Sequence, residues 1–219
     1  PLMILGLYQH NGVFLRSLGD HIHFQIPLWR NLLWDNGCVA GTPDNCQQLM
    51  QAKEHILVYP GGGREVMKND GEQYQLIWKE RTGFARMAMQ HGYDIVPFAA
   101  IGADDAFDIH YDANDFQQSA VGQLLQQSGI SDKYLRGGDA FAPITTGLGL
   151  LPRPEKFYFA FGERISTQEV SHEADDKSSQ WQVREQVAAS IYGLMEDLFA
   201  IREKDQATWP TWRKKLTRR

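Results

Sequence analysis

HILVYPGGGREV, residues 55–66, is a short apolar run followed by three glycines and two opposite charges. An apolar run this short and uninterrupted is typical of a buried parallel strand, so residues 55–59 are predicted to form a central strand. Because glycine has no Cβ, the backbone N–H groups of the turn that follows can approach a ligand oxygen closely. Open α/β sheets bind ligands at the carboxyl ends of their strands, which makes residues 60–65 the candidate site.

The spacing of these glycines excludes the two common nucleotide-binding loops, G-x-x-x-x-G-K-[ST] and G-x-G-x-x-G. Arg64 offers a permanently charged, forked donor that suits a phosphate or a carboxylate. Glu65 can hold that guanidinium in place or accept a hydrogen bond from a hydroxyl group. The residues alone leave a second interpretation equally open, which is a tight turn that carries a surface ion pair.

Strand-like and helix-like segments alternate along the chain, which predicts an α/β fold with a mixed, mostly parallel central sheet flanked by helices. The other expected strands are residues 37–41, 94–102 and 156–162. The expected helices are residues 27–36, residues 43–50 after Thr42, a segment ended by Gly92, a short one around 121–125, and a long C-terminal helix opened by Ser179 and Gln182 as a capping box. One domain is expected over residues 1–205, with a tail at 206–219.

Composition limits the possible partners. The chain has 219 residues, of which 42% are hydrophobic and 22% charged, with a net charge of −5. Five cations lie in the last seven residues, RKKLTRR, so the rest of the chain carries −10. An acidic body lacks the basic face that nucleic acid requires, so no nucleic-acid partner is expected. The two cysteines, Cys38 and Cys46, give neither a disulfide framework nor a zinc spacing and are expected to be free thiols.

Three blocks, taken in order, resemble the glycerolipid acyltransferases: YPGGGRE at 59–65, WKERTGFARMA at 78–88 and IVPFAAIG at 95–102. The first is similar to the F-P-E-G-T-R block of lysophosphatidic acid acyltransferases. It is still more similar to the P-G-G-A-x-E block of the diacylglycerol and monoacylglycerol acyltransferase group. The other two resemble that group's R-x-G-F-x-x-x-A-x-x-x-G-x-x-x-V-P run. The resemblance covers residues 1–165, and it is the ordered set of blocks that is specific.

This resemblance implies transfer of an acyl group from acyl-CoA, or from acyl carrier protein, to a hydroxyl of a glycerolipid at the cytoplasmic face of a membrane. It implies a glycerol-phosphate acyltransferase-like fold, no cofactor besides acyl-CoA as co-substrate, and no metal. Gly62 stands where the lysophosphatidic acid enzymes have Glu, and Pro43 stands where the family often has Arg. Both departures favour a neutral mono- or diacylglycerol acceptor. The substrate-binding residues carried over are Gly61, Gly62, Gly63, Arg64, Glu65, Arg81 and Pro97.

The family's base is the His of an H-x-x-x-x-D motif that precedes the glycine block, and a short apolar helix follows its Asp. PLMILGL, residues 1–7, resembles that helix, so the motif is expected upstream of Pro1 and the chain as given is expected to be inactive. HYDAND, residues 110–115, spells the same pattern, but it follows the glycine block in an acidic stretch, 104–115, interpreted as a solvated loop. Metal binding by these acids is a weaker alternative, because their spacing matches neither an EF-hand nor a zinc site.

Two other functions remain open on the sequence. One is a non-catalytic module that binds lipid or acyl carrier protein and has lost the base. The weaker one is a soluble phosphotransferase, although no Lys follows the glycines and no Asp is placed to hold magnesium. The first of these is separated from an enzyme by the residues upstream of Pro1, where an enzyme is expected to have a His followed five positions later by Asp.

The C-terminal stretch WPTWRKKLTRR combines Trp209 and Trp212 with five cations, a composition that favours a membrane surface, although a frayed, solvated end is the alternative.

One of Trp29 and Trp34 is expected in the core. Residues 129–154 are a candidate lid because they are long for a loop. In DHIHF, His21 and His23 are predicted to share a strand face. Six side chains of the long C-terminal helix are predicted to face the core: Trp181, Val187, Ile191, Leu194, Leu198 and Ile201.

Overall fold

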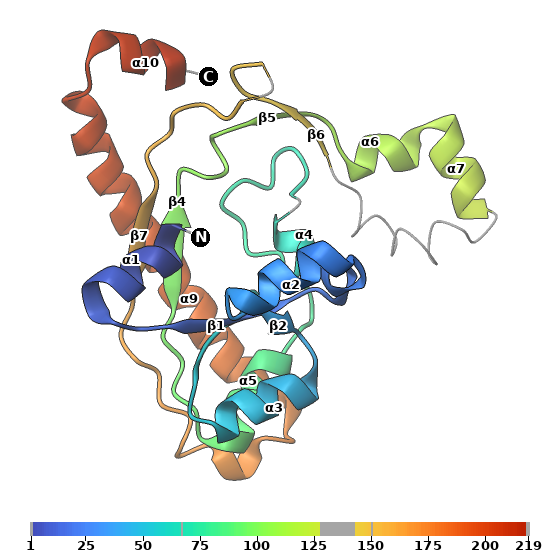
Figure 1. Cartoon of the computed structure of the whole chain (residues 1–219), viewed down its shortest axis with the longest axis vertical. Coiled ribbons are helices and arrows are strands. Elements are labelled where there is room, and N and C mark those ends of the chain that lie inside the picture. The colour runs from blue at the N-terminus through green and yellow to red at the C-terminus, as the bar shows by residue number, and fades with distance from the viewer. Residues whose placement is uncertain (1, 67, 128–142, 150, 218–219) are drawn as a thin grey trace. The chain divides into compact units, whose positions relative to one another are not determined.

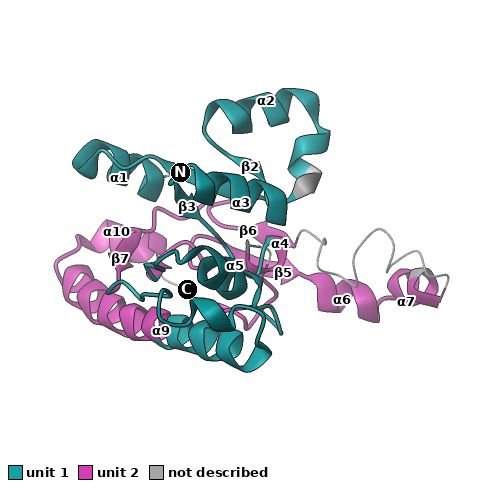
Figure 2. Ribbon diagram, turned by 90° about the horizontal axis from the view of Figure 1, so that it is seen from below, with its two compact units in different colours: residues 1–62, 78–97, 163–189 teal, residues 63–77, 98–162, 190–219 magenta. Residues whose placement is uncertain are grey.

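The computed structural model describes residues 2–66, 68–127, 143–149 and 151–217, which alternate between helices and strands (Figure 1). The α/β class is confirmed. The chain divides into two compact units (Figure 2). Unit 1 comprises residues 1–62, 78–97 and 163–189, and unit 2 comprises residues 63–77, 98–162 and 190–219. The boundary near the candidate site falls between Gly62 and Gly63.

Unit 1 contains a parallel three-stranded sheet in the order β2-β1-β3. Its strands are β1 (Leu15–Gly19), β2 (Val39–Ala40) and β3 (His55–Leu57). The prediction that β3 is a parallel strand is confirmed, but the central strand of this sheet is β1. The sequence LRSLG gave no strand signal, because it holds no β-branched or aromatic residue.

The helices of unit 1 begin and end largely at the predicted signals. Helix α3 starts at Pro43, where the hydroxyl oxygen of Thr42 accepts a hydrogen bond from the Asn45 amide at 3.2 Å. Helix α5 ends at Gly92, whose φ of +58° favours glycine. The set is α1 (Leu2–Asn11), η1 (His21–Gln25), α2 (Pro27–Asp35), α3 (Pro43–Gln51), α5 (Gly83–His91), η3 (Ser171–Glu173) and the first part of α9 (Lys177–Ala207).

The core of unit 1 is built on small side chains of α5. Ala85 and Met89 are fully buried against Ala174 and Val183, so α5 lies close to the start of α9. A buried polar pair joins the same helices, because the Thr82 hydroxyl donates to the side-chain oxygen of Gln180 at 2.7 Å. The amide nitrogen of Gln180 donates in turn to the carbonyl of Ala174 at 2.8 Å, which leaves this buried side chain satisfied.

Unit 2 is built from antiparallel pairs. Strand β4 (Phe98–Ile101) pairs with β7 (Tyr158–Phe161), and β5 (Asp108–Tyr111) pairs with β6 (Ile144–Thr146). On the β4–β7 ribbon, Ala99, Ile101 and Tyr158 are buried, whereas Phe159 and Phe161 are exposed. The helices of this unit are α4 (Gly63–Val66), α6 (Ala113–Gln118), α7 (Ala120–Gln127), the end of α9 and α10 (Thr211–Thr217).

Helix α9 is as long as predicted, but its cap and part of its inward face differ. The carboxylate of Asp176 accepts the Ser179 amide at 2.8 Å, so Asp176 caps the helix and Ser179 lies inside its first turn. Val187, Ile191 and Leu198 are buried as predicted, whereas Trp181 and Ile201 are exposed. A helix of 31 residues packs against different segments along its length, so no single stripe of side chains is buried from end to end.

Other predictions were wrong. Residues 21–25 form a 3-10 helix, so His21 and His23 do not share a strand face. Trp29 and Trp34 are both exposed, although one was expected in the core. The boundary between domain and tail at residues 205 and 206 stays a prediction, as does the candidate lid, of which residues 129–142 and 150 lie outside the described residues.

Candidate functional site

The glycine turn begins directly after β3 and leads into α4. The Gly62 amide donates to the carbonyl of Tyr59 at 2.9 Å, and Gly62 has a φ of +58°. A side chain is rarely accommodated at this backbone angle, which is the physical reason for glycine at the centre of the block. Gly61 is buried, and Gly63 is the first residue of α4. The strand and the turn follow one another as predicted, whereas the short helix α4 was not predicted.

Arg81 joins the second sequence block to the first. Its Nη1 donates to the carbonyl of Gly61 at 2.5 Å and lies 3.4 Å from the carbonyl of Pro60. The next residue, Thr82, is anchored by its buried hydrogen bond to Gln180. The backbone next to Arg81 is therefore anchored while its side chain binds the turn. The Arg81–Gly61 and Thr82–Gln180 contacts both lie within unit 1.

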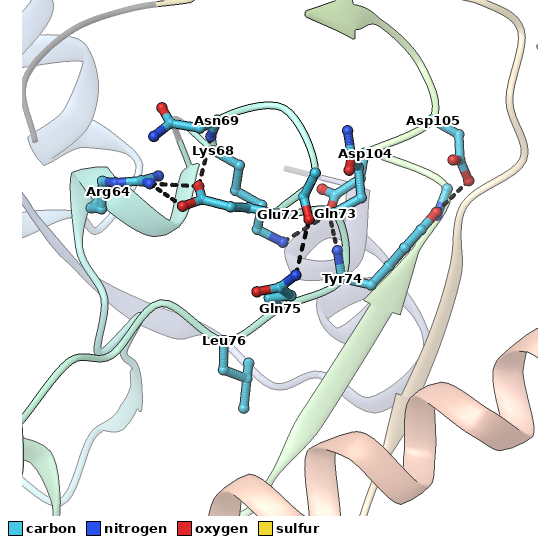
Figure 3. A network of polar contacts seen from close by, with 12 residues as sticks. Arg64, Lys68, Asn69, Glu72, Gln73, Tyr74, Gln75, Leu76, Asp104 and Asp105 are labelled. Carbon is cyan, nitrogen blue, oxygen red and sulfur yellow. Dashed lines mark hydrogen bonds and ion pairs between the residues drawn. The ribbon is translucent and has the colours of Figure 1, made fainter. Parts of the chain in front are cut away.

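Arg64 is buried, with 8% of its surface exposed, and it forms an ion pair within unit 2 (Figure 3). Its Nη2 lies 2.5 Å from each carboxylate oxygen of Glu72. Glu72 is itself held by the Asn69 amide, which donates to it at 2.7 Å. Sequence reasoning missed Glu72 because it lies outside the family blocks. The available signal was that a buried guanidinium requires a carboxylate, but Glu65, Asp70 and Glu72 all fitted that requirement.

The acidic stretch after β4 is a network of paired side chains, so its interpretation as a solvated loop was wrong. Asp104 accepts hydrogen bonds from the Lys68 side chain at 2.7 Å and from the Tyr74 amide at 2.8 Å (Figure 3). Asp105 accepts from the Tyr74 hydroxyl and lies 2.5 Å from Nη1 of Arg202. Burial and the Asp105 carboxylate raise the pKa of Tyr74, so the phenol stays protonated and donates.

The remaining acids of this stretch also have structural partners. Asp108 pairs with Arg153, and Asp112 caps α6 by accepting from the amides of Asn114 and Asp115. Among the residues that the structure describes, no group of three or more His, Cys, Asp or Glu side chains could hold a metal ion. The metal alternative for this stretch therefore has no support in the described part of the chain.

The H-x-x-x-x-D pattern at 110–115 does not form a dyad. His110 is exposed, and its Nε2 lies 2.6 Å from the hydroxyl of Thr146 on the neighbouring strand. Asp115 completes the capping box of α6 by accepting from the Asp112 amide at 3.0 Å. The two side chains therefore serve different elements, and the Asp does not orient the imidazole as a catalytic partner would.

The two remaining predicted site residues are placed as follows. Glu65 lies in α4 and is half-buried. Pro97 is one of the most completely buried side chains and directly precedes β4. The structure thus places Gly61, Gly62 and Arg81 in unit 1 and Gly63, Arg64 and Glu72 in unit 2, with the unit boundary inside the glycine turn.

Comparison with known proteins identifies the family. The model of the family described as "Diacylglycerol acyltransferase" matches residues 10–199, which include all three sequence blocks. The chain belongs to the diacylglycerol acyltransferase family. No solved structure matches it.

Curated relatives are similar over much of this chain but are far longer. Phytyl ester synthase 2, chloroplastic, from Arabidopsis thaliana is 31% identical over 93% of this chain and 31% of its own length. Phytyl ester synthase 1, chloroplastic, from the same plant is 34% identical over 77% of this chain and 25% of its own length. The bovine "DGAT1/2-independent enzyme synthesizing storage lipids" is 34% identical over 42% of this chain. The chain therefore spans about a third or less of the length of the phytyl ester synthases.

Proposed function

We propose that this protein transfers an acyl group from acyl-CoA or acyl carrier protein to the hydroxyl of a neutral lipid. Monoacylglycerol and diacylglycerol are the proposed acceptors, and the names of the phytyl ester synthases add a phytyl alcohol to the candidates. One observation carries the proposal: Arg81 and Gly61, from two family blocks far apart in sequence, are in direct contact at 2.5 Å. The match over residues 10–199 supports it.

The proposed chemistry requires no acyl-enzyme. The acceptor oxygen attacks the thioester carbonyl, an O–C bond forms, the C–S bond breaks, and the hydroxyl proton passes through a base to the leaving thiolate. The turn formed by Gly61, Gly62 and Gly63 would receive the oxygen-rich end of the acceptor, and Gly62 shapes this turn through its own hydrogen bond to Tyr59. Arg64 and Glu65 would supply side-chain hydrogen bonds, and Pro97 is a further substrate-binding residue that the family resemblance implies. The natural full-length protein is the one to test, because the curated relatives that this chain matches are far longer than the chain.

The decisive experiment supplies the natural protein with labelled acyl-CoA or acyl carrier protein, together with monoacylglycerol, diacylglycerol or phytol. Appearance of the labelled ester, with release of the free thiol, supports the proposal and identifies the donor. Binding of acyl-CoA without ester formation would favour the alternative of a non-catalytic lipid-binding module.

Within this assay, Arg64→Ala is expected to lower kcat/KM by roughly a hundredfold, because a fixed charged donor contributes a few kcal/mol in a site that excludes water. Arg86→Ala is the matched control, since Arg86 also pairs with a carboxylate, Asp175, at 2.8 Å but lies exposed on α5. Equal activity in the two variants, with equal thermal stability, would remove Arg64 from the site.

We also infer that the protein acts at the cytoplasmic face of a membrane, with α2 as the contact. Leu28 is 86% exposed, and Trp29 and Leu32 on the same side of α2 are exposed as well, whereas Arg30 is half-buried. A surface helix usually buries its apolar side chains and exposes its charged ones. The exposed leucines and tryptophan of α2 therefore suit a helix that lies in lipid. No helix in the described part of the chain is long and apolar enough to cross a membrane.

The C-terminal tail fits a membrane role less well than its sequence indicated. Trp209 is buried, donates its indole N–H to Asp205 at 3.0 Å and is covered by Arg213 at 4.1 Å from its ring. Only Trp212 of the two tryptophans is exposed. The tail therefore keeps its cations but lacks one of its two proposed aromatic anchors.

A further inference from the structure

The positive charge of Arg64 is already matched by a carboxylate. Both oxygens of Glu72 lie 2.5 Å from Nη2 of Arg64, which is the contact of a tight, charge-assisted pair. Glu72 cannot easily swing away, because its Oε2 also accepts the Asn69 amide at 2.7 Å. The Glu72 amide donates to the carbonyl of Asn69 at 3.2 Å, so side chain and backbone are fixed by the same turn.

A second carboxylate lies in the field of Arg64. Asp112 is buried, and its Oδ2 accepts the Asp70 amide at 3.0 Å. Burial alone would raise the pKa of Asp112, but the amides of Asp115, Asp70 and Asn114 and the charge of Arg64 outweigh burial and hold this pKa below its usual value. Asp112 is therefore ionised at neutral pH, and Arg64 faces two negative charges.

The other cation of the same segment is compensated in the same way. Lys68, four residues after Arg64, donates to Asp104 at 2.7 Å with both side chains largely buried (Figure 3). An anionic group entering this segment would meet cations that already have carboxylate partners. It would lose its hydration without gaining an uncompensated positive charge.

We propose that Glu72 is a specificity-determining residue, which neutralises Arg64 so that the site accepts uncharged hydroxyl lipids and rejects their phosphorylated counterparts. An uncharged acceptor oxygen would meet no charge repulsion from these carboxylates. A phosphate would instead be repelled by Glu72 and Asp112 at short range. This inference rests on the proposed acyltransferase function and on the placement of Arg64 in its acceptor site.

The test compares two acceptors that differ only by one phosphate, 1-oleoylglycerol and 1-oleoylglycerol 3-phosphate, in the same uncharged detergent micelles. The natural full-length protein is assayed with acyl-CoA, and the measured quantity is the ratio of kcat/KM for the two acceptors. Glu72→Gln keeps the size of the side chain and one of its two acceptor oxygens, and it removes the charge. It is expected to shift the ratio toward the phosphorylated acceptor by at least tenfold.

Two further variants show whether the freed charge causes the shift. Arg64→Gln combined with Glu72→Gln removes both charges together and is expected to return the ratio to within about threefold of the wild type. Asp104→Asn removes a carboxylate from the other ion pair of the segment and is expected to leave the ratio unchanged. If Glu72→Gln does not fold, the double variant carries the test. A further loss of the phosphorylated acceptor in that variant would show that Arg64 binds phosphate and would overturn the proposal.

The outcomes separate this inference from the proposed function. A wild-type protein that acylates neither acceptor, nor any other neutral lipid, would refute both. A wild-type protein that acylates 1-oleoylglycerol, combined with an unshifted ratio in a folded Glu72→Gln variant, would refute only the role of Glu72.

Discussion

Two glycines of unit 2 show how differently single positions constrain the chain. Gly102 ends β4 with a φ of +103°, and a Cβ placed on it would lie 2.3 Å from the carbonyl oxygen of Lys156. Gly193 lies in the middle of α9, and a Cβ there would meet nothing within 4 Å. Gly102 is required by its positive φ and by the nearby carbonyl of Lys156, whereas Gly193 only lowers the stability of its helix.

Gly102→Ala is expected to lower the free energy of unfolding by about 2–4 kcal/mol, because the side chain brings both backbone strain and a clash with a carbonyl that cannot move freely. Gly193→Ala is expected to raise it by about 0.5–1 kcal/mol through helix propensity. Urea unfolding followed by circular dichroism measures both. Equal effects of the two substitutions would contradict the role given to Gly102.

At the scale of one element, α2 is the clearest case of a helix whose apolar side is turned outward. It has nine residues, none of them buried, and is about 14 Å long at 1.5 Å per residue. Such a face is far smaller than the ~800 Å² per partner of a standard protein interface. A lipid surface, which α2 could enter lengthwise, therefore suits it better than a second copy of the chain.

Leu28→Glu combined with Leu32→Glu is expected to weaken binding of the natural protein to vesicles of phosphatidylcholine and phosphatidylglycerol by at least a hundredfold, because two leucines lose a few kcal/mol of burial. Co-sedimentation measures the bound fraction, and the thermal midpoint should not change since both side chains are exposed. Lys214→Gln with Lys215→Gln, in the tail, is expected to weaken binding by only about tenfold to thirtyfold. The reverse ranking would assign the contact to the tail.

At the scale of the whole molecule, Asp205 ties the end of α9 to distant parts of the sequence within unit 2. Its carboxylate accepts from the Tyr158 hydroxyl at 2.5 Å, from the Lys156 side chain at 2.9 Å and from the Trp209 indole at 3.0 Å. These three hydrogen bonds, that of Tyr158 first, lower the pKa of Asp205 to about 2. The ionised form is therefore the one that the fold stabilises.

Because the pKa of Asp205 is lower in the folded state than in the unfolded chain, its contribution to stability is present above about pH 4 and is lost as the pH falls toward 2. Asp205→Asn is expected to lower the thermal midpoint at pH 7 and to flatten its decline between pH 4 and pH 2. Asp197→Asn, an exposed position on the same helix, serves as control. An unchanged slope in Asp205→Asn would show that other carboxylates govern acid unfolding.

Local chemistry made part of the fold predictable. Pro27, Thr42 and Gly92 mark helix ends through backbone geometry that depends on the residue itself, and the structure has these ends as predicted. Strand β1 and the strand within the acidic stretch were missed. Both depend on pairing with segments far away in sequence, and β1 has no β-branched or aromatic residue, whereas Ile109 and Tyr111 of β5 lie among acids that are typical of loops.

The candidate site divides in the same manner. Its blocks and their order were visible in the sequence, because the turn needs glycine and the family pattern needs fixed spacing. The partners of those blocks were not: Arg81 could have pointed anywhere, and Glu72 was one of several acids that could have paired with Arg64. A side-chain partner is chosen by where the chain returns in space, and short sequence patterns do not contain that information.

By itself, the sequence determined the α/β class, the family, the glycine turn and the ends of helices such as α3 and α5, since each of these rests on neighbouring residues or on a fixed order of blocks. Tertiary structure alone decided that α2 exposes Leu28, Leu32 and both of its tryptophans, that the acids of 104–115 serve as partners, and that Glu72 compensates Arg64. The physical reason is that burial and charge pairing are settled between segments brought together by folding.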